Sequence, residues 1–349
     1  MTIISSYWPA GFKDSNLENI LLYLTIGNPY RCAMEHLGEL LSLFVAVLWT
    51  ATALFADVAS HRLGAMTVNI IRLTLATVFI AITLMFTIGA PYPIYAGREA
   101  WFWLGLSALV GYTFGDFCLF NSYLVMGARF GQLFMTLAPP AAAIAGWLLL
   151  GEKMEGKSWL AMAVTLSGIA ISILSRSTGE TTKEKKLEFT VPVKGILLGL
   201  GAGIGQGVGL VLSKIGMGHY SQDIPSDAPQ MMGNMMPFAA TMMRAMVGAL
   251  GFIAIMAMQK NLRKLIQAPK DRKGFAFAML TTFFGPFLGV GFSLMAVQYT
   301  NAGIAQTLMA LTPVLIILPY CLIYKQKVKF REIVGVTLSM AGVAMFFLL

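Results

Sequence analysis

Apolar residues along the chain form repeated runs of about 20 residues, the length that an α-helix needs to cross a bilayer. The shorter alternating segments that are typical of a membrane β-barrel are not visible. The pattern therefore predicts an all-α polytopic membrane protein. We expect ten transmembrane helices, at roughly 37–57, 66–88, 100–125, 128–150, 158–175, 195–216, 237–258, 274–297, 302–323 and 331–349.

Polar segments divide these spans into two groups of five. Residues 176–193 contain a Lys- and Glu-rich run and read as a solvated linker. The predicted organisation is an N-terminal extension at 1–36, a first five-helix repeat at 37–175, this polar linker, and a second five-helix repeat at 194–349. The extension has mixed polarity and no span of its own, so Met34 is the candidate native start, which would leave residues 1–33 untranslated.

The two halves share a duplicated stretch, Ala128 to Pro140 in the first and Ala302 to Val314 in the second. At one constant spacing of 174 the matched positions are Gln132 and Gln306, Leu137 and Leu311, Pro139 and Pro313, Lys153 and Lys327, Gly168 and Gly342, Gly111 and Gly285, and Gly115 and Gly289. An odd number of spans in each half makes the second half enter the membrane from the opposite side. The sequence therefore predicts two inverted repeats, an arrangement typical of secondary transporters.

The composition agrees with a lipid-facing surface, since 57% of residues are hydrophobic and only 12% are charged, about half the charged fraction of a soluble domain. The net charge of +9 comes without a basic stripe and interleaved aromatics, which argues against a nucleic-acid partner. Loops after odd-numbered spans hold about 17 Lys and Arg and the other side holds about 6, so the positive-inside rule places both termini outside. The three cysteines are too few and scattered for a disulfide framework or zinc site, and we expect no cofactor or metal.

Charges inside predicted spans are the best pointers to function, because each costs about 2.5–3.5 kcal/mol at the bilayer centre. Arg72 in the second span and Asp116 in the third reach comparable depth because these helices run antiparallel, so the two side chains can pair, with Asn121 and Gln132 near the same level. The pair is either a structural salt bridge or part of substrate or proton handling, and the sequence leaves both open.

The repeat separates these two charges. Arg72 is echoed by Arg244 in the seventh span, whereas the counterpart of Asp116 is Val290. An acid that is present in just one of the two halves is what a coupling or recognition group would need. The candidate substrate-binding or coupling residues are Asp116, Arg72, Trp49, Tyr112, Gln132, Gln206, Arg244 and Gln306.

Aromatic residues and prolines within spans have structural explanations beside functional ones. Trp49 lies near the middle of the first span with Gln206 as its counterpart, and Tyr112 lies one helical turn before Asp116, but helix packing would explain either aromatic. Prolines inside spans predict kinked or interrupted helices, as an alternating-access protein needs, although membrane helices also tolerate proline. These prolines are Pro139, Pro140, Pro286, Pro313 and Pro319.

Glycines and methionines each form one conspicuous cluster. The glycines at alternate positions from Gly199 to Gly209 give overlapping GxxxG pairs, which favour close helix packing over a nucleotide loop. The four methionines between Met231 and Met236 fall in the longest expected loop, where they read as flexible apolar filler rather than as soft-metal ligands.

Several motifs together carry a family resemblance. They are Trp49, Ile71-Arg72-Leu73, Ala128 to Pro140, Gly151-Glu152 and Gly168 in the first half, and Ala302 to Pro313 and Gly342 in the second. With these motifs the chain resembles the EamA family of the drug/metabolite transporter superfamily over residues 37–349. The resemblance implies a secondary carrier of small metabolites, often an exporter, with a central cavity between the halves.

The chain departs from that family pattern in two places. Tyr324-Lys325-Gln326 stands where a second Gly-Glu is expected, which argues against a symmetric pair of acids. Family members also usually keep both termini in the cytoplasm, against the charge count above.

The sequence therefore predicts a multi-pass protein of the cell membrane, of the bacterial inner-membrane type, that moves a small-molecule substrate by alternating access. Proton coupling through Asp116 is an open alternative to a purely structural role. One other class is a non-transporting scaffold or receptor. Another is an intramembrane aspartyl protease, whose Gly-x-Gly-Asp motif Gly115-Asp116 partly resembles, although Thr113 replaces the first glycine and a second mid-membrane aspartate is lacking.

Overall fold

The computed structural model describes residues 36–126, 134–177, 193–315 and 330–348, and these residues contain helices and no strand. The N-terminal extension, most of the polar linker and Gln132 lie outside the described residues. The helices are α3 Leu37–Leu63, α4 Ala65–Ile88, α5 Arg98–Ala108, η1 Leu109–Asp116, α6 Phe117–Met126, η2 Met135–Leu137, α8 Ala138–Leu150, α9 Gly156–Ser177, α10 Val193–Asp223, α11 Gln230–Met258, α12 Arg263–Gln267, η3 Ala268–Lys270, α13 Arg272–Thr282, η4 Phe283–Gly289, α14 Val290–Tyr299, α15 Ala302–Met309, α16 Thr312–Leu315 and α18 Phe330–Leu348.

Six helices in the described part of the chain are long and apolar enough to cross a membrane. They correspond to the first, second, third, sixth, seventh and eighth of the ten expected spans. Met135–Leu150 and Ile333–Leu348 are shorter apolar helices at the expected fourth and tenth spans. The protein is therefore an all-helical, multi-pass membrane protein.

The seventh span begins earlier than expected, and this corrects the reading of the methionine cluster. α11 starts at Gln230, directly after Pro229, and includes all four methionines. Met232 and Met236 are buried in the core, with 7% and 6% of their surface exposed. Methionine is a good helix former and fills irregular gaps, so a methionine-rich run continues a helix rather than a loop.

The duplicated stretches are interrupted helices. In the first, a 3₁₀ turn at Met135–Leu137 precedes α8, whose first turn holds Pro139. In the second, α15 ends at Met309 and α16 restarts at Thr312, next to Pro313. Proline has no backbone N–H and suits the first turn of a helix, so these prolines mark restarts rather than mid-helix kinks. Pro319 lies outside the described residues.

The third and eighth spans each contain a π-helical segment, η1 and η4. The segments begin at Leu109 and Phe283, which are separated by the same spacing of 174 as the sequence repeat. A π-helical turn takes an extra residue and rotates the side chains that follow it, and such turns are frequent at functional sites. Pro286 lies inside η4 and cannot donate to the helical ladder, whereas η1 widens at the matching position without a proline.

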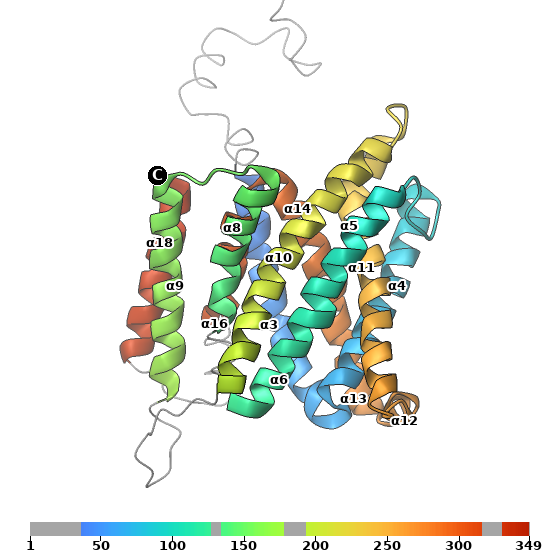
Figure 1. Cartoon of the computed structure of the whole chain (residues 1–349), viewed down its shortest axis with the longest axis horizontal. Coiled ribbons are helices and arrows are strands. Elements are labelled where there is room, and N and C mark those ends of the chain that lie inside the picture. The colour runs from blue at the N-terminus through green and yellow to red at the C-terminus, as the bar shows by residue number, and fades with distance from the viewer. Residues whose placement is uncertain (1–35, 127–133, 178–192, 316–329, 349) are drawn as a thin grey trace, which may run out of the picture. The chain divides into compact units, whose positions relative to one another are not determined.

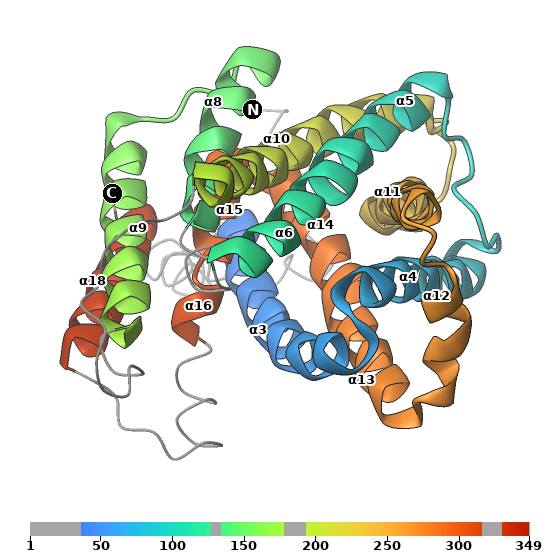
Figure 2. The ribbon, with the colours of Figure 1, turned by 60° about the horizontal axis from the view of Figure 1, so that its bottom comes forward.

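Residues Gly38–Leu349 form one packed unit. Within this unit α10 lies along the continuous helix of α5, η1 and α6, and α4 lies along α11 (Figures 1 and 2). α3 packs on η4, where Thr52 and Trp49 contact Gly285 and Gly289. α8 packs against both α10 and α15.

The helices α9 and α18 pack mainly on each other, and both views draw them side by side at the edge of the ribbon (Figures 1 and 2). Their contact is symmetric in the sequence repeat. Gly168 of α9 lies against the Ser339 backbone of α18, and Gly342 of α18 lies against the Thr165 backbone of α9. Gly168 and Gly342 are 174 residues apart, and so are Thr165 and Ser339.

Candidate functional site

The glycine run of α10 brings this helix close to two neighbours at once, as the GxxxG spacing predicts. An ideal Cβ on Gly209 would lie 2.7 Å from the Gly111 Cα, and one on Gly205 would lie 3.0 Å from the Gly115 Cα. On another face of α10, Gly203 and Gly207 contact the backbone at the start of α8. Any side chain at these positions would hold the helices apart, so glycine fixes how near α10 comes to η1.

This close approach gives Asp116 two partners from two other helices. Arg72 Nη2 on α4 donates to Asp116 Oδ2 at 2.9 Å, and Gln206 Nε2 on α10 donates to Asp116 Oδ1 at 2.6 Å. Gln206 Nε2 also donates to the Gly111 carbonyl oxygen at 3.1 Å. The Asp116 and Arg72 side chains are 7% and 18% exposed. The pair expected from the sequence is present, and Gln206 joins it in a buried network of three helices.

Arg244 approaches the same segment from α11. Its guanidinium carbon lies 4.7 Å from the centre of the Tyr112 ring, a cation–π arrangement, and Arg244 is only 5% exposed. Both arginines act electrostatically on Asp116. We call Arg72, Tyr112, Asp116, Gln206 and Arg244 the η1 charge cluster.

The remaining candidate residues do not contact this cluster in the described structure. Trp49 is half-buried, and its Nε1 lies 2.7 Å from the position of a Cβ on Gly289. Gln306 is buried in α15, and Asn121 donates to the Phe117 carbonyl of its own helix at 2.8 Å. Gln132 lies outside the described residues. The structure thus joins five of the eight candidates. Trp49 of α3 instead lies against η4, the repeat counterpart of η1.

A second polar group, half-buried and missed by the sequence reasoning, joins Glu39, Glu152, Lys214 and Thr300. Lys214 of α10 forms an ion pair with Glu152 and donates to the Thr300 carbonyl at 2.8 Å. The Thr300 hydroxyl donates to Glu39 Oε1 at 2.7 Å, and the Ala302 N–H donates to Glu152 Oε2 at 3.0 Å. Glu39 and Lys214 both fall inside expected spans, so the cost of a charge at that depth was a usable signal.

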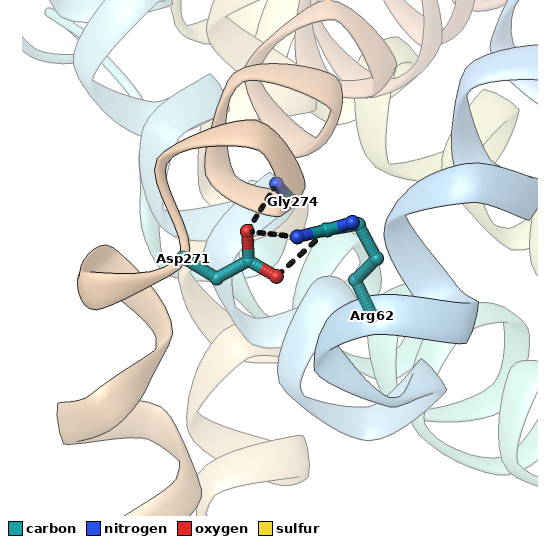
Figure 3. Close-up of polar contacts among 3 residues, drawn as sticks. All are labelled: Arg62, Asp271 and Gly274. Carbon is teal, nitrogen blue, oxygen red and sulfur yellow. Dashed lines mark hydrogen bonds and ion pairs between the residues drawn. The ribbon is translucent and has the colours of Figure 1, made fainter.

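An exposed ion pair ties the other end of α3 to α13 (Figure 3). Arg62 Nε and Nη2 each donate to a carboxylate oxygen of Asp271 at 2.8 Å, and the Gly274 N–H donates to the same carboxylate at 3.0 Å. These hydrogen bonds, Arg62 first and then the Gly274 amide, hold the pKa of Asp271 below its usual range. Asp271 therefore caps α13 as a charged residue.

Comparison with known protein families gives a match over most of the chain. The EamA-like transporter family matches residues 36–174 and again residues 228–348. This chain belongs to the EamA-like transporter family. Membership of this EamA-like family indicates a membrane transporter of the drug/metabolite type.

Two further comparisons bear on the EamA-like chain. It is similar to the putative permease-like protein YdzE of Bacillus subtilis (strain 168), with 36% identity over 58 residues, which is 16% of this chain and 74% of that protein. A solved crystal structure of a protein superposes with a TM-score of 0.65 at 18% identity, covering 89% of this chain and 96% of its own. The latter likeness shows a shared fold.

The five-residue cluster combines two cations, one acid and two neutral polar side chains. Arg72 and Gln206 occupy both oxygens of Asp116, and no second acid contacts it among the described contacts. Within the described residues, no group of three or more His, Cys, Asp and Glu side chains could hold a metal ion. The cluster offers guanidinium, amide, phenol and carboxylate groups, which bind polar solutes and exchange ion-pair partners.

Proposed function

We propose that this EamA-like protein is a secondary transporter that exports small metabolites across a bacterial-type inner membrane by alternating access. The observation that carries the proposal is the η1 charge cluster. Its charged and polar side chains come from the π-helical segment η1 and from α4, α10 and α11, and they are largely buried. Charges at this depth are costly, and in membrane proteins they mark substrate or ion pathways by default.

Alternating access requires two similar halves, and we propose that residues 37–175 and 194–349 are inverted five-helix repeats joined by the linker at 176–193. The positions of η1 and η4, the interrupted helices before α8 and α16, and the reciprocal contact of α9 with α18 support this pairing. All of them keep the spacing of 174. Rocking one repeat against the other around a central site is the motion that inverted repeats permit.

In this scheme Asp116 and Arg72 couple substrate to the conformational change. A proton taken up by Asp116 would break its ion pair with Arg72 and free α4 from η1. The charged and polar groups that face Asp116 are Arg72 from α4, Arg244 from α11 and Gln206 from α10. Trp49, Tyr112, Gln132, Gln206, Arg244 and Gln306 complete the proposed substrate path.

Solid-supported-membrane electrophysiology on proteoliposomes tests the proposal. Pools of amino acids, nucleosides, sugars and cationic drugs are applied across a pH gradient to the wild type and to Asp116→Asn. We expect a substrate-dependent current in the wild type that the variant loses. A current that survives in the variant would reduce Asp116 to a structural partner of Arg72, and loaded-vesicle efflux then decides the direction of transport.

Absence of flux for every pool, with protein that is folded by size-exclusion chromatography, would count against transport. In that case a non-transporting scaffold or receptor would be the better reading. Arg263→Gln on α12 serves as the control variant, because it removes an exposed arginine that is not part of the cluster.

A further inference from the structure

The η1 charge cluster contains one more positive than negative charge. Arg72 and Arg244 are its two cations, and Asp116 is its one acid among the described residues. Arg72 and Gln206 already occupy both carboxylate oxygens of Asp116. Arg244 is therefore left without a carboxylate partner in the described structure.

The environment of Arg244 leaves one of its buried donors unpaired. Arg244 as a whole is 5% exposed, and its Nε is buried without a hydrogen-bond partner. The guanidinium carbon lies over the Tyr112 ring, 4.7 Å from the ring centre. A cation–π contact supplies no hydrogen-bond acceptor oxygen to the N–H groups of the arginine.

Two more donors of the same cluster are buried without a partner, Arg72 Nε and the Tyr112 hydroxyl. Leaving a buried donor unpaired costs about 1–3 kcal/mol, and more for charged groups. Three such donors, one on η1 and the others on α4 and α11, are difficult to explain as packing alone. They describe a site that suits a partner which accepts hydrogen bonds and carries negative charge.

The sequence repeat explains how this excess arose. Arg72 and Arg244 are repeat counterparts, but the acid that pairs with Arg72 has Val290 as its counterpart. Arg244 therefore has no acid at the position that matches Asp116. Val290 packs at the edge of the same apolar cluster that contains Tyr112.

We propose that Arg244, with Arg72 Nε and the Tyr112 hydroxyl, binds the carboxylate of a monoanionic metabolite. This inference rests on the proposed transport function and names the substrate class of that site. One added negative charge neutralises the cluster, and a planar carboxylate matches the fork of an arginine.

Matched pairs of probes isolate the carboxylate. Purified protein in nanodiscs is titrated with benzoate and benzamide, and with N-acetyl-leucine and N-acetyl-leucine amide, and binding is followed by the midpoint of thermal unfolding. We expect the carboxylates to raise the midpoint at concentrations at which the amides do not. Equal effects of acid and amide, or no carboxylate effect for either pair, would overturn the inference. This comparison uses the wild type alone, so it does not depend on whether a variant folds.

Variants assign the effect to a residue. Arg244→Gln should weaken carboxylate binding by about 30-fold or more, since it removes the charged partner of a buried pair. Arg244→Lys should retain part of the affinity, and exposed Arg263→Gln should behave as wild type. Unchanged carboxylate affinity in Arg244→Gln would make Arg244 a structural cation–π contact.

The two proposals fail in different ways. Currents for neutral or cationic pools, without any carboxylate preference, would leave transport standing and remove the anion site. Carboxylate binding that depends on Arg244, with no flux of the same carboxylates, would leave the site standing and contradict transport.

Discussion

Two helix crossings related by the sequence repeat have the same glycine spacing in the backbone but different side chains around it. η1 crosses α10, and η4 crosses α3, each through glycines four residues apart on a π-helical segment. At the first crossing Gln206 reaches Asp116, whereas at the second Trp49, the counterpart of Gln206, lies against Gly289. The first crossing holds the η1 charge cluster, and the second is lined by phenylalanines such as Phe284 and Phe287.

The difference shows how a duplicated scaffold becomes asymmetric without losing its fold. At η1 both helices contribute glycine, because Gly111 meets Gly209, and the backbones come close. At η4 the counterpart of Gly209 is Thr52, so in that contact only one of the two residues, Gly285, is a glycine. The crossing at which backbone meets backbone is the one that carries the polar network, since glycine contacts let an amide side chain reach the neighbouring helix.

The largest expected effect comes from removing the acid that only the η1 crossing has. Asp116→Asn keeps the shape but leaves Arg72 and Arg244 buried opposite a neutral amide, which we expect to destabilise the protein by about 3–5 kcal/mol. Thermal or denaturant unfolding in detergent measures this. The double variant Arg72→Gln/Asp116→Asn should recover part of the loss, and a purely additive double variant would contradict an ion pair of this importance.

The next effect compares the two crossings at their glycines. A Cβ on Gly209 would meet backbone atoms of Gly111 at 2.7 Å, whereas a Cβ on Gly285 would meet the Thr52 side chain at 2.9 Å. A side chain can rotate and a helix backbone cannot, so Gly209→Ala should be less stable than Gly285→Ala by about 1–3 kcal/mol. Gly218→Ala on the same helix as Gly209 has open space around it and is the control. Equal stability of the first two variants would mean that the crossings are not packed differently.

A third variant tests the comparison by giving the second half the acid it lacks. Val290→Asp places a carboxylate at the counterpart of Asp116, next to the apolar cluster that contains Tyr112. It should satisfy Arg244 and weaken binding of carboxylate probes by about tenfold, a difference of about 1.4 kcal/mol. Titration of the thermal midpoint with benzoate measures it, and Val290→Asn controls for polarity without charge. Tighter carboxylate binding in Val290→Asp would contradict the charge count.

The smallest effect concerns the outer ends of the two crossings. Asp271 caps α13 and pairs with Arg62 of α3, while at the equivalent junction Asp223 of α10 accepts a hydrogen bond at 2.9 Å from the N–H of Gly97, before α5. The pKa of Asp271 is lowered in the folded protein, so its carboxylate stabilises the fold above the ordinary aspartate range. That stabilisation is lost as the pH falls through the lowered pKa.

We expect Asp271→Asn to lower the thermal midpoint slightly at neutral pH and to match the wild type in acid. Asparagine can still cap α13, so the variant removes the charge and keeps the hydrogen bond to Gly274. A difference that persists at low pH would assign the effect to the cap instead of the ion pair.

The sequence alone determined the features that depend on composition, periodicity and spacing. It predicted the membrane class, the duplicated unit, the pairing of Arg72 with Asp116, the close packing of the α10 glycines and the family. Each of these follows from residues that are near in the chain or related by a fixed spacing, so no knowledge of helix rotation is needed. The methionine cluster was placed wrongly because a boundary between helix and loop depends on what the segment packs against.

Only the tertiary structure decided which side chains share a site. The π-helical turn in η1 changes the direction in which Tyr112 and Asp116 point, and the glycine contacts set how far Gln206 can reach. The same structure brought Arg244 onto Tyr112 and joined Glu39, Thr300, Lys214 and Glu152. These contacts link segments far apart in the chain, and they depend on the rotation and depth of each helix, which packing sets after the helices have formed.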